Sequence, residues 1–241
     1  KFPSLSIHIT WMGAHDIPNG IDRKQYVESV LSEQLPSVLE QGYADSVDVF
    51  CEPGWFTLSD TEDICKESIN GGLNVRLHVD EFVDGGGLDL AAELGARTAD
   101  HALHSNDDAR ENASKAGTVQ GFLPGTPYVL GNDNWPPAIL CNENNWAWSL
   151  ASDFNPNCQS LSIPMAGSLA THRMRVDPIA ALAASTRNPA TTLTDDRLID
   201  GIISVGSKAN FNVLHSHLIE SWCQTPGQSP IFETYIMGER Y

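Results

Sequence analysis

An apolar, strand-like stretch of this chain ends in a cluster of ionisable side chains. The segment LNVRLHVDEF, residues 73–82, passes from alternating apolar positions into His78, Asp80 and Glu81. Burying such groups costs several kcal/mol unless a partner compensates for the lost hydration. A strand has no structural need for this cluster, so its position indicates a functional site.

A second carboxylate follows another strand-like run. Asp153 comes directly after WAWSLAS, residues 146–152. A neutral imidazole and a carboxylate are ligands that Zn²⁺ and Fe²⁺ accept. We therefore predict that His78 and Asp153 bind one divalent metal ion. The alternative is that each is a polar residue with local hydrogen bonds, but the position of both at strand ends favours the metal.

Two further residues near these strand ends have the chemistry of catalytic groups. His101 ends the segment ADH, where it can stabilise an oxyanion or move protons, and the adjacent Asp100 can orient its ring. The alternative role for His101 is to cap the next helix. Glu81, three residues after His78, can accept a hydrogen bond from a ligand N–H group.

The segment HSH, residues 215–217, also resembles a metal-binding pair. On a strand, alternate residues share a face, so two such histidines can bind one ion. This segment lies in a turn-rich tail, far from the strand and helix repeat that carries the other candidates. We do not assign it as a ligand pair.

Strand-like runs alternate with helical patterns along most of the chain. The runs are residues 5–12, 47–51, 73–79, 98–103, 118–123 and 146–152. Such alternation predicts an α/β fold with parallel strands, either a doubly wound sheet or part of a (β/α)8 TIM barrel. Polar residues recur where the runs end, at His15, Glu52, His78, His101 and Asp153. Catalytic residues of a barrel collect at that rim, so the barrel is favoured.

The pattern changes after about residue 160. Two helices are expected at 160–174 and 177–193, the second with Asp177 as N-cap and Pro178 as its first residue. A short, strand-like tail follows. We predict a partial TIM-barrel catalytic domain over residues 1–200 and the C-terminal portion of a small β-sandwich over 201–241.

Composition limits the classes of partner. The formal net charge of −17 argues against nucleic acid and anionic membrane surfaces, which attract clustered Lys and Arg. The acidic surface is compatible with either a saline habitat or ordinary solubility. The five cysteines have no paired spacing, which predicts reduced thiols in a cytoplasmic protein.

Several segments together resemble imidazolonepropionases, a family of the metal-dependent amidohydrolase superfamily. They are WMGAHDIP, VDVFCEPGWFTLSD, RLHVDEF, AAELGARTADH, FLPGTPYVL and LASDFNPN. The resemblance implies a (β/α)8 barrel with a small β-sandwich. It also implies hydrolysis of the cyclic amide of 4-imidazolone-5-propanoate to N-formimidoyl-L-glutamate in histidine degradation.

The resemblance also assigns roles. It implies that His78, ending barrel strand five, and Asp153, ending strand eight, bind the metal, and that Asp153 accepts a proton from the attacking water. His101 would polarise the scissile carbonyl. Glu81 would bind the imidazolone ring nitrogen, and His15 would contact the substrate. On this interpretation the metal and the substrate compensate the charges that end LNVRLHVDEF.

A further segment, DFNPNC, matches the part of the family that binds formimidoyl-glutamate. The resemblance therefore implies that Asn155, Asn157 and Cys158 bind the product side of the substrate. Cys158 stands where the family commonly has a small hydroxyl residue, so we assign the contact to its backbone.

The family's HxH metal pair on the first strand, and its substrate-binding Arg and Tyr, have no match here. We therefore expect an N-terminally truncated chain that lacks about two barrel strands and is inactive or metal-poor by itself. Two alternatives remain, a purine or pyrimidine deaminase of the same superfamily and a non-catalytic barrel fragment. The expected partners are one zinc or iron ion and a small-molecule substrate, and a homodimer stays open.

Overall fold

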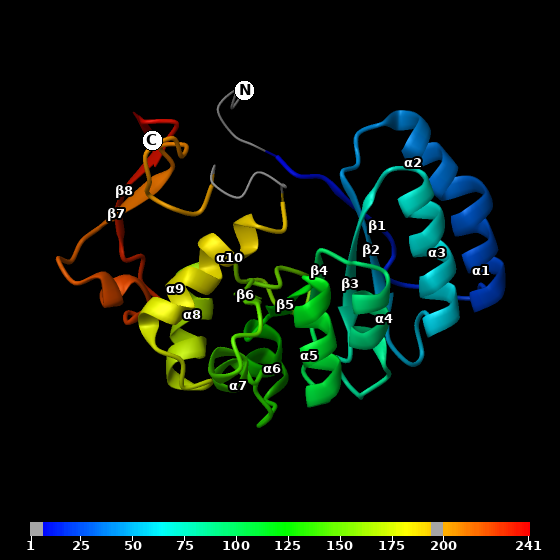
Figure 1. Ribbon diagram of the computed structural model, residues 1–241, viewed down its shortest axis with the longest axis horizontal. Helices are drawn as coiled ribbons and strands as arrows, with labels where there is room; N and C mark the ends of the chain where they lie inside the picture. Colours follow the sequence, from blue (N-terminus) through cyan, green and yellow to red (C-terminus); the bar gives the residue numbers. More distant parts are fainter. Residues whose placement is uncertain (1–6, 194–199) are drawn as a thin grey trace. The chain divides into compact units, whose positions relative to one another are not determined.

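The computed structural model describes residues 7–193 and 200–241, which form two compact units. One unit is Ile7–Gln120 and the other contains Gly121–Tyr241. We describe each by itself (Figure 1). None of the helices within the described residues combines the length and apolar character that a membrane span requires.

Parallel strands form the centre of the unit Ile7–Gln120. They are β1 (Thr10–Ala14), β2 (Ser46–Cys51), β3 (Asn74–Val79) and β4 (Thr98–His101), with β5 (Val119–Phe122) beginning in this unit. Residues 5 and 6 of the first predicted run, 5–12, lie outside the described residues, and β1 begins only at Thr10 and continues to Ala14. The strands β2 to β5 match their predictions closely, and the last predicted run, 146–152, is a strand over three residues. In β2, Val47, Val49 and Cys51 belong to the apolar core, whereas Asp48 and Phe50 occupy the alternate positions.

The helices of this unit cover the apolar face of its strands. They are α1 (Arg23–Ser29), the π-helix η1 (Val30–Gln34), α2 (Leu35–Gln41), α3 (Leu58–Asn70), α4 (Gly87–Glu93) and α5 (Asp107–Ala116). In Figure 1, α1, α2 and α3 lie on one side of β1, β2 and β3. The sequence predicts a single helix over 23–42, but Pro36 lacks an amide hydrogen, and the π-helix precedes it.

Side-chain caps explain where the helices begin. Thr57 forms a capping box with Asp60 at α3, and Asn106 accepts the Ala109 N–H at α5. Gly117 ends α5 with a φ of 84°, a left-handed conformation that glycine adopts without a steric cost.

The unit that contains Gly121–Tyr241 has its own apolar core around Trp148, Met174 and Trp222. Its elements are α6 (Gly125–Leu130), α7 (Ala138–Glu143), β6 (Trp148–Leu150), α8 (Ile163–His172), α9 (Pro178–Ser185), α10 (Arg187–Ala190), β7 (Phe211–Leu214), the 3₁₀ helix η2 (Ile219–Cys223), β8 (Ile231–Ile236) and β9 (Glu239–Arg240). Asp177 caps α9 through the Ile179 N–H, as predicted, and Pro178 is its first residue. The short helices α6 and α7 were not expected from the sequence.

Two sheets result from these strands. Hydrogen bonds link β1 to β6 in chain order, whereas β7, β8 and β9 form a separate antiparallel sheet. A doubly wound sheet reverses its strand order at a switch point, and a (β/α)8 barrel does not. The fold class is therefore α/β with the strand order of a partial TIM barrel. The predicted domain boundary at residue 200 adjoins residues outside the described ranges and stays a prediction.

Candidate active site

The unit Ile7–Gln120 gathers four of the predicted residues at the carboxyl ends of its strands. His15 follows β1, His78 lies in β3, Glu81 follows β3 and His101 ends β4. The ring centroids of His15 and His78 are 4.7 Å apart, and those of His78 and His101 are 5.3 Å apart. His101 Nε2 lies 3.5 Å from Glu81 Oε2. Residues separated by up to 86 positions in the sequence thus form one cluster.

A buried carboxylate that the sequence analysis did not assign lies within this cluster. Asp48, in β2, is 4% exposed, and its Oδ1 lies 2.9 Å from His78 Nδ1 and 3.1 Å from His15 Nε2. Burial by itself would raise the pKa of Asp48. The charge interaction with His78 and the hydrogen bonds from both imidazoles outweigh burial, so this pKa lies below its usual range. Asp48 is therefore an ionised acceptor at neutral pH.

These residues provide donor atoms suited to a metal ion. The ligand atoms of His15, Asp48 and His78 all lie within 4.8 Å of one another. Imidazole nitrogen and carboxylate oxygen are the donors that zinc and iron(II) accept in proteins. The imidazoles of this rim therefore fit a divalent transition metal, whereas Asp48 Oδ1 already accepts from two ring nitrogens.

The backbone at the end of β4 has an uncommon conformation. His101 has a φ of 66° and Ala102 a φ of 44°, whereas non-glycine residues seldom adopt positive φ. His101 pairs with Val79 in the register of β3 and β4. The Val79 side chain packs into the apolar core, whereas the His101 ring packs against the ring of His78. Burial, followed by the nearby His78 charge, lowers the pKa of His101 well below its ordinary value. His101 is therefore a neutral imidazole at pH 7.

The loop after β3 is held by two carboxylates other than Glu81. Glu52 accepts the backbone N–H groups of Glu81, Phe82 and Val83 at 3.0–3.1 Å. Burial raises the pKa of Glu52, although these hydrogen bonds act in the opposite direction. The position of Glu81 thus depends on a side chain from the end of β2.

Asp80 has a different role from the one expected. Its carboxylate accepts the backbone N–H groups of Gly85, Gly87 and Leu88 and the hydroxyl of Ser105. The expectation that metal and substrate compensate every charge at the end of LNVRLHVDEF is wrong for Asp80. Local backbone donors, two of them at the start of α4, and the Ser105 hydroxyl compensate it.

An aromatic cluster flanks the histidines. Phe50 contacts Trp55 at a centroid distance of 5.0 Å, and Trp55 stacks on Phe82 at 5.9 Å. Phe50 also lies 6.1 Å from His15. The cluster places apolar ring faces and edges beside the imidazoles. The sequence pattern does not reveal this cluster, because its residues come from two different loops and a strand.

The remaining predicted residues belong to the other unit. Asp153 follows β6 with a φ of 56°, and its carboxylate accepts the Thr126 hydroxyl. Asn155 Oδ1 accepts the N–H groups of Asn157 and Cys158, at 2.8 and 3.2 Å, so its side chain closes a turn. The predicted sharing of one metal by His78 and Asp153 joins residues of the two units and stays a prediction.

Cys158 is buried and lines a cavity of about 230 Å³ within this second unit. Its Sγ lies 3.7 Å from the Ser152 carbonyl oxygen. The cavity wall also includes Gly125, Ser160 and Ser162. The burial of the Cys158 side chain is compatible with the assignment of its contact to the backbone.

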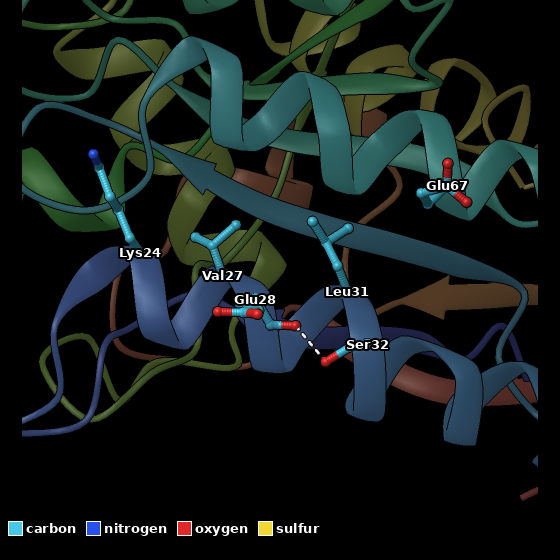
Figure 2. A pocket seen from close by; sticks show the side chains of 6 residues that line it. All are labelled: Lys24, Val27, Glu28, Leu31, Ser32 and Glu67. Atoms are coloured by element: carbon cyan, nitrogen blue, oxygen red, sulfur yellow. Dashed lines mark hydrogen bonds between the residues drawn. The ribbon is translucent and has the colours of Figure 1, made fainter.

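A second hollow lies on the helices of the unit Ile7–Gln120 and has a volume of about 460 Å³ (Figure 2). Ser32 Oγ of η1 donates to the Glu28 carbonyl oxygen of α1, so this hydroxyl is engaged by the backbone one turn earlier. None of the predicted site residues lines this hollow. Its lining residues are Lys24, Val27, Glu28, Leu31, Ser32 and Glu67.

The chain is similar in sequence to several imidazolonepropionases. It is 36% identical over 214 residues to the imidazolonepropionase of Shewanella piezotolerans, covering 88% of this chain and 52% of the relative. It is 38% identical over 184 residues to that of Haloarcula marismortui, covering 76% and 44%. With the Desulfotalea psychrophila imidazolonepropionase it shares 35% over 240 residues, covering 98% and 57%. The chain spans about half the length of the curated relatives it matches. No family model matches it.

Solved structures share the fold at low sequence identity. An adenosine deaminase from Xanthomonas campestris with bound Zn has a TM-score of 0.74 at 14% identity, covering 97% of this chain and 60% of that one. A guanine deaminase from C. acetobutylicum has a TM-score of 0.73 at 12% identity, covering 97% and 64%. These likenesses support the α/β barrel fold, and the relatives, together with the family motifs in order along the sequence, show that the chain belongs to the imidazolonepropionase family.

Proposed function

We propose that this chain carries part of the site that hydrolyses the cyclic amide of 4-imidazolone-5-propanoate to N-formimidoyl-L-glutamate in histidine degradation. The observation that carries the proposal is the cluster of His15, His78, His101 and Glu81 at one rim of the parallel strands. The identity to imidazolonepropionases supports the choice of substrate. The proposed setting is the cytoplasm.

The residues of the cluster have complementary roles. His101 is neutral, so it can donate one N–H to the carbonyl oxygen of the ring as negative charge develops there. Glu81 lies beside His101 and can accept the N–H of the imidazolone ring. His15 and the aromatic side chains of Phe50 and Phe82 would contact the flat ring.

We assign the metal to His78 and Asp153, with one zinc or iron ion as cofactor. Such an ion supplies Lewis acidity, which activates water near neutral pH. The carboxylate of Asp153 would accept the proton that the attacking water loses. Asn155, Asn157 and the backbone of Cys158 are proposed to hold the formimidoyl-glutamate side. Their turn, closed by the Asn155 side chain, supports this role because it pre-forms the segment.

The proposed partner is a small molecule rather than nucleic acid or a membrane. The supporting observation is the net charge of −17, which repels polyanions. A homodimer is retained as the proposed assembly to be checked by sedimentation.

A chimaera tests the function directly. The chain replaces the aligned half of the Shewanella piezotolerans relative, and the purified product is supplied with 4-imidazolone-5-propanoate. We expect ring opening to formimidoyl-glutamate, a loss of at least about 100-fold with His78→Ala, and full activity with the matched control His215→Ala. The isolated chain, assayed in parallel, tests the expectation that it is inactive by itself.

Two results would contradict the proposal. Ammonia release from purines or pyrimidines without ring opening of the imidazolone would indicate a deaminase. A folded, metal-loaded chimaera that turns over neither substrate class would favour the non-catalytic alternative.

A further inference from the structure

We propose that Asp48 is a positioning residue that sets the ring tautomer and orientation of His78 and His15 together. The inference rests on the proposed function in one respect, the assignment of His78 as a metal ligand. Asp48 itself would contact neither the metal nor the substrate and would act through the two imidazoles.

The strand register brings these three residues together. Asp48 lies in β2 between the loop after β1, which carries His15, and β3, which carries His78. A single carboxylate oxygen, Oδ1, contacts both rings, at 2.9 Å from His78 Nδ1 and 3.1 Å from His15 Nε2. The two rings meet nearly edge-on, at an interplanar angle of 77°. One side chain therefore restrains both imidazoles at once.

The chemistry of a carboxylate dictates which ring nitrogen carries hydrogen. An ionised carboxylate only accepts hydrogen bonds, so both contacting nitrogens must donate. A neutral imidazole has one N–H group, so in its neutral form His78 carries its hydrogen on Nδ1 and its lone pair on Nε2. His15 is the reverse, with its hydrogen on Nε2 and its lone pair on Nδ1. Asp48 thus holds two neighbouring histidines in opposite tautomers.

This arrangement prepares His78 for a ligand role. A metal ligand must present a lone pair, and a hydrogen bond from the other ring nitrogen to a carboxylate fixes the tautomer and raises ligand basicity. Asp48 is 4% exposed, so solvent competes weakly for its oxygen. The neighbouring strand positions Val47 and Val49 pack into the apolar core, which prevents β2 from rotating to release the carboxylate.

Histidine tautomers can be measured directly. The full chain, labelled with ¹⁵N-histidine, is examined by long-range ¹H–¹⁵N NMR at pH 8, without metal. We expect hydrogen on Nδ1 of His78 and on Nε2 of His15 in the unmutated chain. In Asp48→Ala, no acceptor remains at this position, so at least one ring should change tautomer. The matched control is Asp45→Ala, which removes an exposed carboxylate of the preceding loop and should leave both rings unchanged.

Zn²⁺ alone serves as the second probe in the same spectra. Its addition should displace the His78 Nε2 signal of the unmutated chain. In Asp48→Ala, a similar displacement should need roughly 10- to 100-fold more Zn²⁺, the usual effect of removing such a partner of a ligating histidine. An equal response in the two chains, including none in either, would overturn the link to the metal.

The unmutated chain provides a test that needs no variant. Hydrogen on Nε2 of His78, or on Nδ1 of His15, would overturn the proposal, and so would unchanged tautomers in a folded Asp48→Ala chain. These readouts do not depend on turnover. An inactive chimaera whose histidines have the expected tautomers would therefore refute the proposed function and leave the role of Asp48 intact.

Discussion

The parallel strands of Ile7–Gln120 and the antiparallel sheet of β7, β8 and β9 both have histidines at their ends, in opposite environments. His15, His78 and His101 contact one another and the carboxylates of Asp48 and Glu81. His215 and His217 are exposed, and they lie in a bend after β7 rather than on the strand. The ring of His215 packs edge-on against Phe232 at 5.2 Å.

This comparison shows that residue spacing alone does not identify a metal site. HSH has the spacing of a metal pair, yet the bend removes the alternation that would place both rings on one face. The clustered histidines have no such spacing, and strand register unites them. Among the described residues, the groups with ligand atoms near enough to hold a metal do not include His215 or His217.

Solvent access is the physical reason for the contrast. Parallel sheets have both faces covered, so polar groups at their ends lie in a medium of low dielectric constant, where hydrogen bonds and charges act strongly. In the antiparallel sheet, β7 has mostly exposed residues. Water competes there for every polar contact.

The largest expected difference between the two regions is in packing. Leu77 in β3 is fully buried, so Leu77→Ala should lower the free energy of unfolding by about 2–5 kcal/mol, because a cavity remains. Val213 in β7 is 37% exposed, and Val213→Ala should cost less than about 1 kcal/mol. Urea denaturation of both variants measures the two changes in the free energy of unfolding. Equal changes would contradict the expected difference in packing between β3 and β7.

A smaller effect is expected from the carboxylate that starts α4. Asp80→Ala removes the acceptor of several buried N–H groups, which should cost about 2–3 kcal/mol. Asp84 lies in the same loop but is exposed, and Asp84→Ala should cost less than about 1 kcal/mol. Denaturation midpoints measure the stability of the two variants. If Asp84→Ala lowered the stability as much as Asp80→Ala, burial of the carboxylate would not be the cause.

Thiol chemistry sharpens the contrast in solvent access. Burial raises the pKa of Cys51 to about 11. At pH 8 its thiolate fraction is then about one in a thousand, against about one in four for an ordinary thiol. Alkylation of Cys51 should therefore be about 200-fold slower in the native chain than in guanidinium, as followed by mass spectrometry. Equal rates in the two states would contradict the burial of this strand end.

The smallest expected difference is in the rates at which histidines of the two regions are acylated. His101 is 6% exposed, whereas His215 and His217 are exposed. Diethyl pyrocarbonate should modify the two tail histidines about tenfold faster than His101, since His101 requires local opening. Peptide mapping after short reaction times gives the ratio. Faster modification of His101 would show that the rim of the parallel strands is open to solvent.

Much of the fold could be predicted from the sequence because the relevant forces are local. Apolar runs of four to eight residues predicted the strands, and the capping residue Asp177 with Pro178 predicted the start of α9. The residues His78, Glu81 and His101 were identifiable because each ionisable group comes at the end of such a run. The resemblance added their roles, which stay predictions.

Asp48 could not be assigned in the same way. Its partners lie 33 and 30 positions away in the sequence, and the register of β1, β2 and β3 brings them within hydrogen-bonding distance. A signal was present, since an aspartate inside the apolar run VDVFC must have a partner if the strand is buried. The sequence does not say which partner.

By itself, then, the sequence determined the order of the elements, their caps and the ionisable groups at the strand ends, because propensity and periodicity act over a few residues. The tertiary structure alone decided which groups meet. It directed Asp80 to the α4 amides rather than to a ligand, gave His101 its positive φ and joined Asp48 to two imidazoles. Such pairings depend on strand register and burial, which are set by packing across distant parts of the chain.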